Sequence, residues 1–202
     1  MILAKRVAFW MMLVFSVLIA LVSYRFVGLG IEGAFANVGA SVLEPRAVFV
    51  AHVVAAPIAL LLGPFQFITR LRARRPVLHR WTGRLYAIAI LVGGIAGLLL
   101  ALDATDRPVA AAGFGLLAVL WLVFTTLAVA HARARRFAAH RRMMIRSFAL
   151  TFAAVTLRLQ APFLSFDGTP YLEISHILAW SCWVPNLILA ELWLRSDGKR
   201  AG

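Results

Sequence analysis

Three ionisable side chains, His52, Arg158 and His176, lie within long apolar stretches of this sequence and are the first candidates for chemistry. A central arginine in a membrane-spanning helix costs about 2.5 to 3.5 kcal/mol on insertion scales, so such groups usually face the interior of a helix bundle. At about 1.5 Å per residue, His52 lies about 9 Å and Arg158 about 12 Å from the same end of the predicted bundle. His176 falls in the first turn of the last apolar stretch, also at that end. The spacing therefore predicts that the three groups lie near one end of the bundle.

The residue types favour a redox cofactor, with two other interpretations open. Two imidazoles on facing helices are a known arrangement for the axial ligands of haem b, and an arginine can neutralise a haem propionate. His52 and His176 are therefore candidate ligands of haem iron, the only metal we expect there, and Arg158 is a candidate anion partner. Alternatively, the three side chains bond neighbouring helices or interfacial water. In the third interpretation they line a pocket for a quinone or an anionic small molecule, with Arg158 as donor.

Two short basic loops, predicted at residues 70–86 and 133–148, carry a second group of candidates. Each contains six arginines, a His-Arg pair, and an arginine followed two residues later by an aromatic residue. Clustered arginines disfavour a metal cation but suit phosphate and carboxylate groups, so anionic lipid headgroups or haem propionates are candidate ligands. Metal ligation by the two histidines, and a purely topogenic role for the charges, stay open. The candidate residues are His79, Arg84, His140 and Arg146.

The composition predicts an integral membrane protein. Of the 202 residues, 62% are hydrophobic, and the apolar stretches reach the roughly 20 residues that a helix needs to cross a bilayer. We therefore predict an all-α fold, a six-helix transmembrane bundle that forms a single membrane domain over residues 1–202. The expected spans are residues 7–28, 47–69, 84–102, 109–130, 147–166 and 174–194.

The charged residues predict the orientation of these spans. Seventeen of the 21 Lys and Arg residues fall at one end of the predicted bundle, which we call the inner end. Six of the eight acidic residues fall at the opposite, outer end. Because basic residues are retained on the cytoplasmic side of a membrane, we expect both termini in the cytoplasm. The formal net charge of +13 is thereby explained without nucleic acid, for which the sequence offers no recognition fold.

Two glycine motifs predict local geometry. Gly93 and Gly97 stand four residues apart on one helical face, which permits close packing of a neighbouring helix. The Gly63-Pro64 pair is expected to bend its span, because proline removes one backbone hydrogen bond and clashes with the preceding turn.

The sequence assigns no catalytic residue. It has no Gly-rich phosphate-binding loop and no His-Glu-x-x-His motif, and Cys182 is the only cysteine. Whether the protein is an enzyme therefore stays open.

The motifs taken together resemble those of a bacterial family of predicted membrane proteins called domain of unknown function 2306. The resemblance begins at His52 and covers most of the remaining chain. Its elements are Gly63-Pro64-Phe65-Gln66-Phe67, Leu78-His79-Arg80 with Gly83-Arg84-Leu85-Tyr86, Trp121, His140-Arg141-Arg142 with Met144-Ile145-Arg146-Ser147, Thr156-Leu157-Arg158, and Trp183-Val184-Pro185-Asn186 with Ala190-Glu191. The sequence departs from the expected pattern at Met143, where tryptophan is common, and at Phe148, where tyrosine is common. The resemblance implies a multi-span protein of the bacterial cytoplasmic (inner) membrane and no particular activity.

Our leading hypothesis is a redox-associated membrane protein that binds haem b or a quinone between the second, fifth and sixth spans. One alternative is a transporter or lipid-binding protein without a cofactor, whose basic loops hold anionic lipid headgroups. Another is a membrane assembly factor that acts through protein contacts. A buried histidine and a buried arginine suit all three.

Overall fold

The computed structural model describes residues 2–35, 43 and 46–198, and the structural statements below concern these residues. Residues 1, 36–42, 44–45 and 199–202 of the predicted single domain lie outside this part. The described residues form helices and turns without a strand, which confirms the predicted all-α fold. Six segments are long and apolar enough to cross a membrane, as expected. They are Arg6–Ser23, Arg46–Phe67, Pro76–Asp103, Pro108–Arg133, Phe137–Leu164 and Tyr171–Asp197.

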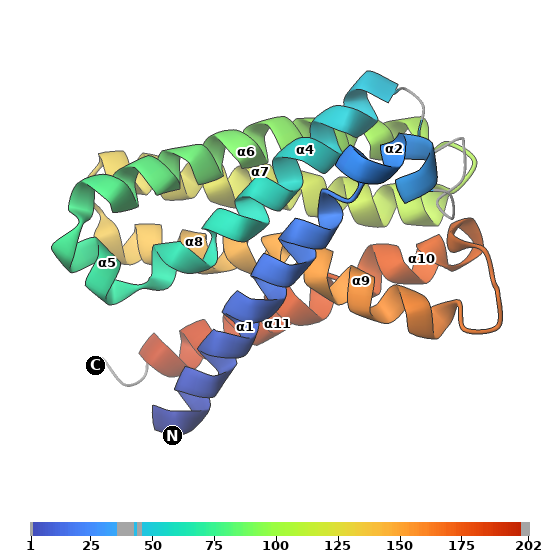
Figure 1. The fold of residues 1–202 in the computed structure, drawn as a ribbon. Coiled ribbons are helices and arrows are strands. Elements are labelled where there is room, and N and C mark those ends of the chain that lie inside the picture. The colour runs from blue at the N-terminus through green and yellow to red at the C-terminus, as the bar shows by residue number, and fades with distance from the viewer. Residues whose placement is uncertain (1, 36–42, 44–45, 199–202) are drawn as a thin grey trace.

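The first span is shorter than predicted and lies obliquely across the bundle. Helix α1 (Ile2–Ser23) packs against α4 (Arg46–Leu62) and α9 (Ala153–Leu164), and Figure 1 shows it crossing one side of the molecule at an angle. It ends at Ser23, and the short helix α2 (Phe26–Ala34) follows. Arg25 stabilises this arrangement, because its Nε and Nη2 donate to the Ala34 carbonyl at 3.0 and 2.5 Å.

The predicted bend at Gly63-Pro64 is confirmed. Helix α4 ends at Leu62, and the chain continues as the 3-10 turn η1 (Pro64–Phe67) before α5 (Thr69–Arg74). Gly63 lies against the ring of Phe148, so that a Cβ atom at this position would overlap the ring. Only glycine therefore allows this approach without a shift of the Phe148 ring.

The predicted close packing at Gly93 and Gly97 is also confirmed. Both residues belong to α6 (Pro76–Asp103), which packs against α4. A Cβ atom at Gly93 would lie 3.2 Å from the backbone nitrogen of Ala56, and one at Gly97 would lie 3.0 Å from Nδ1 of His52. The absence of side chains thus brings α6 within hydrogen-bonding reach of α4.

The basic segments are mostly helical, in contrast to the predicted loops. Helix α6 begins at Pro76 and α8 (Phe137–Thr151) at Phe137, well before the predicted spans that start at residues 84 and 147. Proline at the first helical position loses no hydrogen bond, arginine is a good helix former, and long arginine side chains reach the headgroups from within the helix. His79 and His140 consequently occupy the same place, three residues after the start of a helix.

The remaining helices complete the bundle. Helix α7 (Pro108–Arg133) packs against α6, α8 and α10 (Tyr171–Ser181), and α8 continues into α9 after a break at Phe152. Helix α11 (Val184–Gly198) follows α10 and returns along α8 to the inner end.

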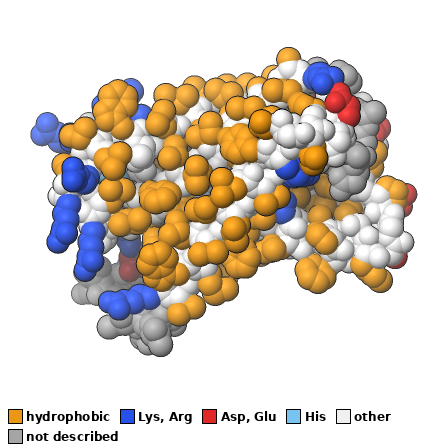
Figure 2. Space-filling model, in the orientation of Figure 1, with side chains coloured by type: hydrophobic (Ala, Val, Ile, Leu, Met, Phe, Trp, Pro, Cys, Tyr) orange, Lys and Arg blue, Asp and Glu red, His pale blue; other side chains and the backbone are white. Residues whose placement is uncertain are grey.

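The surface matches a membrane environment. Figure 2 shows hydrophobic side chains covering the middle of one face, with basic side chains gathered at the end of the bundle that holds α5. Acidic side chains are visible mainly at the opposite end. The charge distribution along the bundle is therefore the one that the sequence predicts.

A buried hydrogen-bond network joins α6, α7 and α8. The Tyr86 hydroxyl lies 2.8 Å from Ser147 Oγ and 2.9 Å from Thr151 Oγ1. Trp121 Nε1 donates to Thr151 Oγ1 at 2.8 Å, and Thr125 Oγ1 lies 2.7 Å from Ser147 Oγ. All five side chains are buried. Because lipid offers no competing partners, such contacts fix the register of the three helices.

Candidate functional site

The outer part of the bundle brings ionisable side chains of three segments together. His52 belongs to α4, Arg158 to α9, and Arg25 to the turn between α1 and α2. Arg158 lies within electrostatic range of both His52 and Arg25. The Tyr24 hydroxyl donates to the Val54 carbonyl at 2.7 Å and so holds the Arg25 turn level with the His52 region of α4. We call the group formed by His52, Arg158, Arg25, Tyr24 and Tyr171 the outer cluster.

Arg158 has hydrogen-bond donors that the protein does not use. A guanidinium group has five N–H donors and no acceptor. The structure commits one of them, since Nη1 donates to the Ala154 carbonyl of its own helix at 3.1 Å. None of the ion pairs formed by described residues includes Arg158. This partly buried cation within a membrane span therefore has no counter-charge in the described protein.

Arg25 differs from Arg158 in that all three of its guanidinium nitrogens contact backbone carbonyls. Besides the bonds to Ala34, its Nη1 contacts the Val22 carbonyl at 3.5 Å, and its guanidinium lies 4.9 Å from the centre of the Phe35 ring. Arg25 therefore shapes the turn and contributes positive charge, whereas Arg158 can still donate to a ligand.

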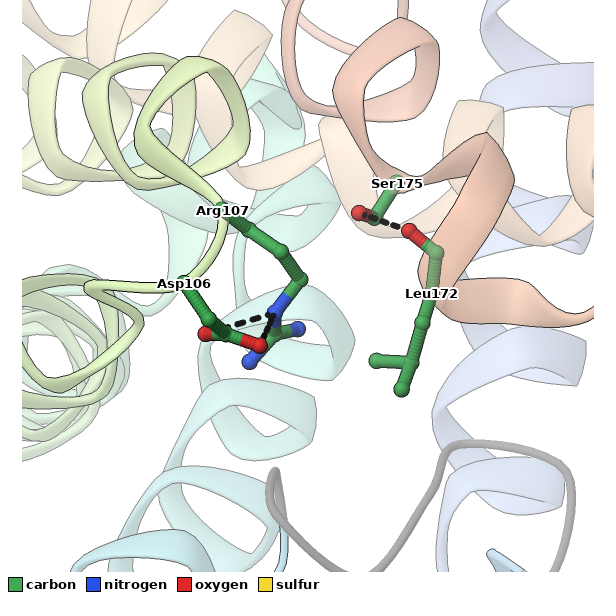
Figure 3. A network of polar contacts seen from close by, with 4 residues as sticks. All are labelled: Asp106, Arg107, Leu172 and Ser175. Carbon is green, nitrogen blue, oxygen red and sulfur yellow. Dashed lines mark hydrogen bonds and ion pairs between the residues drawn. The ribbon is translucent and has the colours of Figure 1, made fainter.

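Tyr171 connects the outer cluster with Arg107. Tyr171, the first residue of α10, lies within electrostatic range of Arg158 and Arg107. Arg107 precedes α7 and pairs with Asp106 through Nε, at 3.1 and 3.2 Å from the two carboxylate oxygens (Figure 3). On α10, which faces this turn in Figure 3, the Ser175 hydroxyl donates to the Leu172 carbonyl at 2.6 Å. The residues beside Tyr171 are thus polar, and Asp106 neutralises the charge of Arg107.

His52 has a defined tautomer. Its Nδ1 lies 2.8 Å from the Gly93 carbonyl oxygen. Because a carbonyl oxygen can only accept, Nδ1 carries the hydrogen, and in the neutral ring the lone pair remains on Nε2. Contact with Gly97 fixes the ring plane from the α6 side. His52 therefore both ties α4 to α6 and presents one uncommitted nitrogen.

His176 lies apart from His52. It is exposed on α10, and its Nδ1 donates to the Glu173 carbonyl of its own helix at 2.7 Å. Helix α10 packs mainly against α7 and α9, whereas α4 packs mainly against α6 and α1. The described residues also contain no group of three metal-ligating side chains. Joint ligation of haem iron by His52 and His176 stays a prediction. The helix packing does not support it, because α4 and α10 are not main packing partners.

The four candidates at the inner end separate into two kinds. His79 lies within electrostatic range of His140, so the two basic segments meet there. Arg84 is exposed and stacks on Trp81, with its guanidinium carbon 4.8 Å from the ring centre. Of these three side chains, Arg84 is exposed and free to meet a headgroup, whereas His140 is anchored through Nδ1 to the Ala128 carbonyl at 2.9 Å.

Arg146, by contrast, is occupied within the protein. Its Nε and Nη2 donate to the two carboxylate oxygens of Glu191 at 2.5 and 2.9 Å, which joins α8 to α11. Nearby, Arg141 pairs with Asp197 at 2.7 Å and stacks on Trp193. Since a two-pronged carboxylate contact neutralises the guanidinium charge, Arg146 serves helix docking in this structure.

The family described as "Predicted membrane protein (DUF2306)" matches residues 49–194. The chain belongs to this family. The match includes His52, Arg158 and His176, whereas α1 and α2 precede it. The comparisons match no curated protein and no solved structure. Membership therefore establishes a DUF2306 membrane protein and assigns no reaction to it.

Three residues in or beside the outer cluster of this DUF2306 protein are not predicted from the sequence. Arg25, Arg107 and Tyr171 stand beside turns or helix ends, where polar residues are common. The available signal was the shortage of basic residues at the outer end, which makes Arg25 and Arg107 exceptions in the charge pattern.

The Arg146–Glu191 pair generates a stability prediction. Glu191→Gln leaves the guanidinium without its counter-charge, so we expect the free energy of unfolding in detergent to fall by about 1 to 3 kcal/mol. The matched control is Asp197→Asn, which breaks the more exposed pair with Arg141 and should cost less than about 1 kcal/mol. Equal losses in both variants, measured by thermal unfolding, would contradict a special role for the Arg146 pair.

Proposed function

We propose that this protein binds an anionic amphiphile in the outer half of its bundle, with Arg158 as the partner of the anionic group. The observation that carries the proposal is the guanidinium of Arg158, which is partly buried in a membrane span and lacks a carboxylate partner among the described residues. An unpaired charge is costly there, and a bound anion removes that cost. A phosphate or carboxylate group matches the planar donor set of arginine.

The surroundings of Arg158 support an anion rather than a cation. Arg25 and Arg158 lie within electrostatic range of each other without a shared carboxylate. Asp106 in the nearby turn is already paired with Arg107, and no described acid forms an ion pair with Arg158 or Arg25. A cation would therefore be repelled, whereas an anion gains from at least two guanidinium groups.

A groove in the outer half of the bundle has room for an apolar tail. It has a volume of about 380 Å³ and lies between α9 and α10. Leu159 and Gln160, which follow Arg158 directly, line it together with Phe163, Leu164, Ile177 and Ser181. Gln160 and Ser181 bond each other at 2.8 Å and so present a satisfied surface, and the other walls are apolar. A hydrocarbon chain can lie in this groove, although the lining residues of α9 stand on a different face of the helix from Arg158.

The test of this proposal uses oleate as the probe, in detergent-purified protein titrated under native mass spectrometry. Arg158→Gln keeps a polar, uncharged side chain with N–H donors, although a shorter one, and removes the charge; we expect it to weaken oleate binding about tenfold. Arg158→Lys keeps the charge and should retain part of the affinity. Arg195→Gln, an exposed arginine of α11, is the control for net charge. Unchanged oleate affinity in Arg158→Gln would overturn the proposal.

A second candidate function is the redox hypothesis, in which the protein binds haem b or a quinone. It is favoured by the uncommitted Nε2 of His52, since a histidine whose Nδ1–H is engaged by a carbonyl is ready to ligate a metal. Arg158 fits a propionate or a quinone carbonyl, but His176 offers no facing second ligand. A haem would supply one-electron transfer, and the residues of this chain would bind and orient it.

A visible absorption spectrum tests this second candidate. The protein is expressed with a haem precursor, purified, and measured oxidised and after dithionite reduction. Haem binding predicts a Soret band that sharpens on reduction in the wild type and disappears in His52→Ala. A colourless folded protein, or a spectrum unaffected by His52→Ala, would exclude His52 as an iron ligand.

We also propose that the protein resides in the bacterial cytoplasmic membrane with both termini in the cytoplasm. The support is the arginine-rich inner end, which carries the two basic segments. The expected outcome is that alkaline phosphatase fused within the turn at residues 104–107 is active, while the same enzyme fused after residue 202 is inactive. The opposite pattern would reverse the proposed orientation.

A further inference from the structure

The starts of α6 and α8 form a matched pair at the inner end. An arginine precedes each helix, a histidine stands in the first turn, and another arginine follows that histidine. The backbone N–H of His79 donates to the Arg75 carbonyl and that of His140 to the Arg136 carbonyl, at 3.1 and 2.9 Å. His79 lies within electrostatic range of His140, Arg72 and Arg80. The fold thus collects two imidazoles and several arginines from segments that are distant in sequence.

The two imidazole rings differ in how they are held. His140 Nδ1 donates to the Ala128 carbonyl at 2.9 Å, which anchors the ring to the end of α7 and leaves Nε2 uncommitted. His79 Nδ1 is buried and has no hydrogen-bond partner among the described residues. The other ring nitrogen, Nε2, is not enclosed in this way and has no hydrogen-bond partner among the described residues, so it is the nitrogen of His79 that a ligand can reach.

Counter-charge is scarce around these rings. The described acids at the inner end, Glu191 and Asp197, already pair with Arg146 and Arg141. Arg72 and Arg80 form no ion pair with a described residue. The N-termini of α6 and α8 add the positive ends of two helix dipoles. The field at this place is therefore strongly positive.

We propose that the inner end, between the starts of α6 and α8, binds a phosphate group. His79 donates from Nε2, and Arg72 and Arg80 supply charge. His140 is held by its Nδ1 bond to the Ala128 carbonyl, so its Nε2 remains for a P–O–H group of the phosphate. A metal ion is disfavoured, because the arginines repel it and the described residues supply no third ligand. The same chemistry fits a phospholipid headgroup or a free phosphate compound.

The test uses two phosphate probes on the full-length protein in detergent. Inorganic phosphate is followed by ³¹P NMR, and dioleoyl phosphatidic acid by native mass spectrometry. We expect His79→Leu and His140→Leu each to weaken binding about tenfold, the effect of losing one charge-assisted hydrogen bond. His79→Gln keeps a donor close to the place of Nε2 and should retain most of the affinity. Circular dichroism confirms that each variant is folded.

The two probes distinguish the sources of the phosphate. Binding of phosphatidic acid without binding of inorganic phosphate, with loss in the histidine variants, identifies a headgroup site. Binding of inorganic phosphate with the same loss identifies a site for soluble phosphate compounds. The proposal is overturned if neither probe binds, if the histidine variants bind as the wild type does, or if Arg195→Gln weakens binding equally. The histidine variants are compared with their parent in an Arg158→Gln background, where the outer site no longer contributes, so this proposal and that of the outer site fail separately.

Discussion

A bilayer interior offers no water to a polar group, and this constraint decides where the side chains of this protein lie. Thr156 and Asn186 bond each other between α9 and α11, Gln160 and Ser181 do so between α9 and α10, and Tyr86 shares its hydroxyl with two side chains of α8. Each interhelical pair therefore orients two helices while satisfying itself. Against this background of satisfied groups, the unpaired guanidinium of Arg158 and the orphan nitrogen of His79 stand out.

The sequence predicts those features that depend on local chemistry. Apolar length gives the six spans, Gly63-Pro64 gives the bend, and the spacing of Gly93 and Gly97 gives the close contact with α4. The starts of α6 and α8 are not predicted, because hydropathy marks the edge of the hydrocarbon layer, and a helix rich in arginine continues beyond that edge.

Interhelical partners are the part that the sequence does not contain. Arg146 and Glu191 are 45 residues apart, and nothing in their neighbours shows that α11 returns along α8. The same limitation applies to Arg25, whose approach to Arg158 depends on the oblique course of α1. His52 and Arg158 are the exception, because matched depths in two spans placed them at one level before any helix packing was known.

The hydrogen-bond network around Tyr86 has a consequence for the electrical behaviour of the core. Its five side chains hold five polar hydrogens, yet the oxygen and nitrogen atoms make six contacts, two of them to backbone carbonyls. One contact must therefore always lack a hydrogen, and the positions of the heavy atoms do not decide which one. The protons can rearrange by rotation of hydroxyl groups alone, so the local dipole can reverse while every helix stays in place. In the middle of this bundle the helices can therefore stay fixed while the hydroxyl hydrogens reorient in response to an electric field.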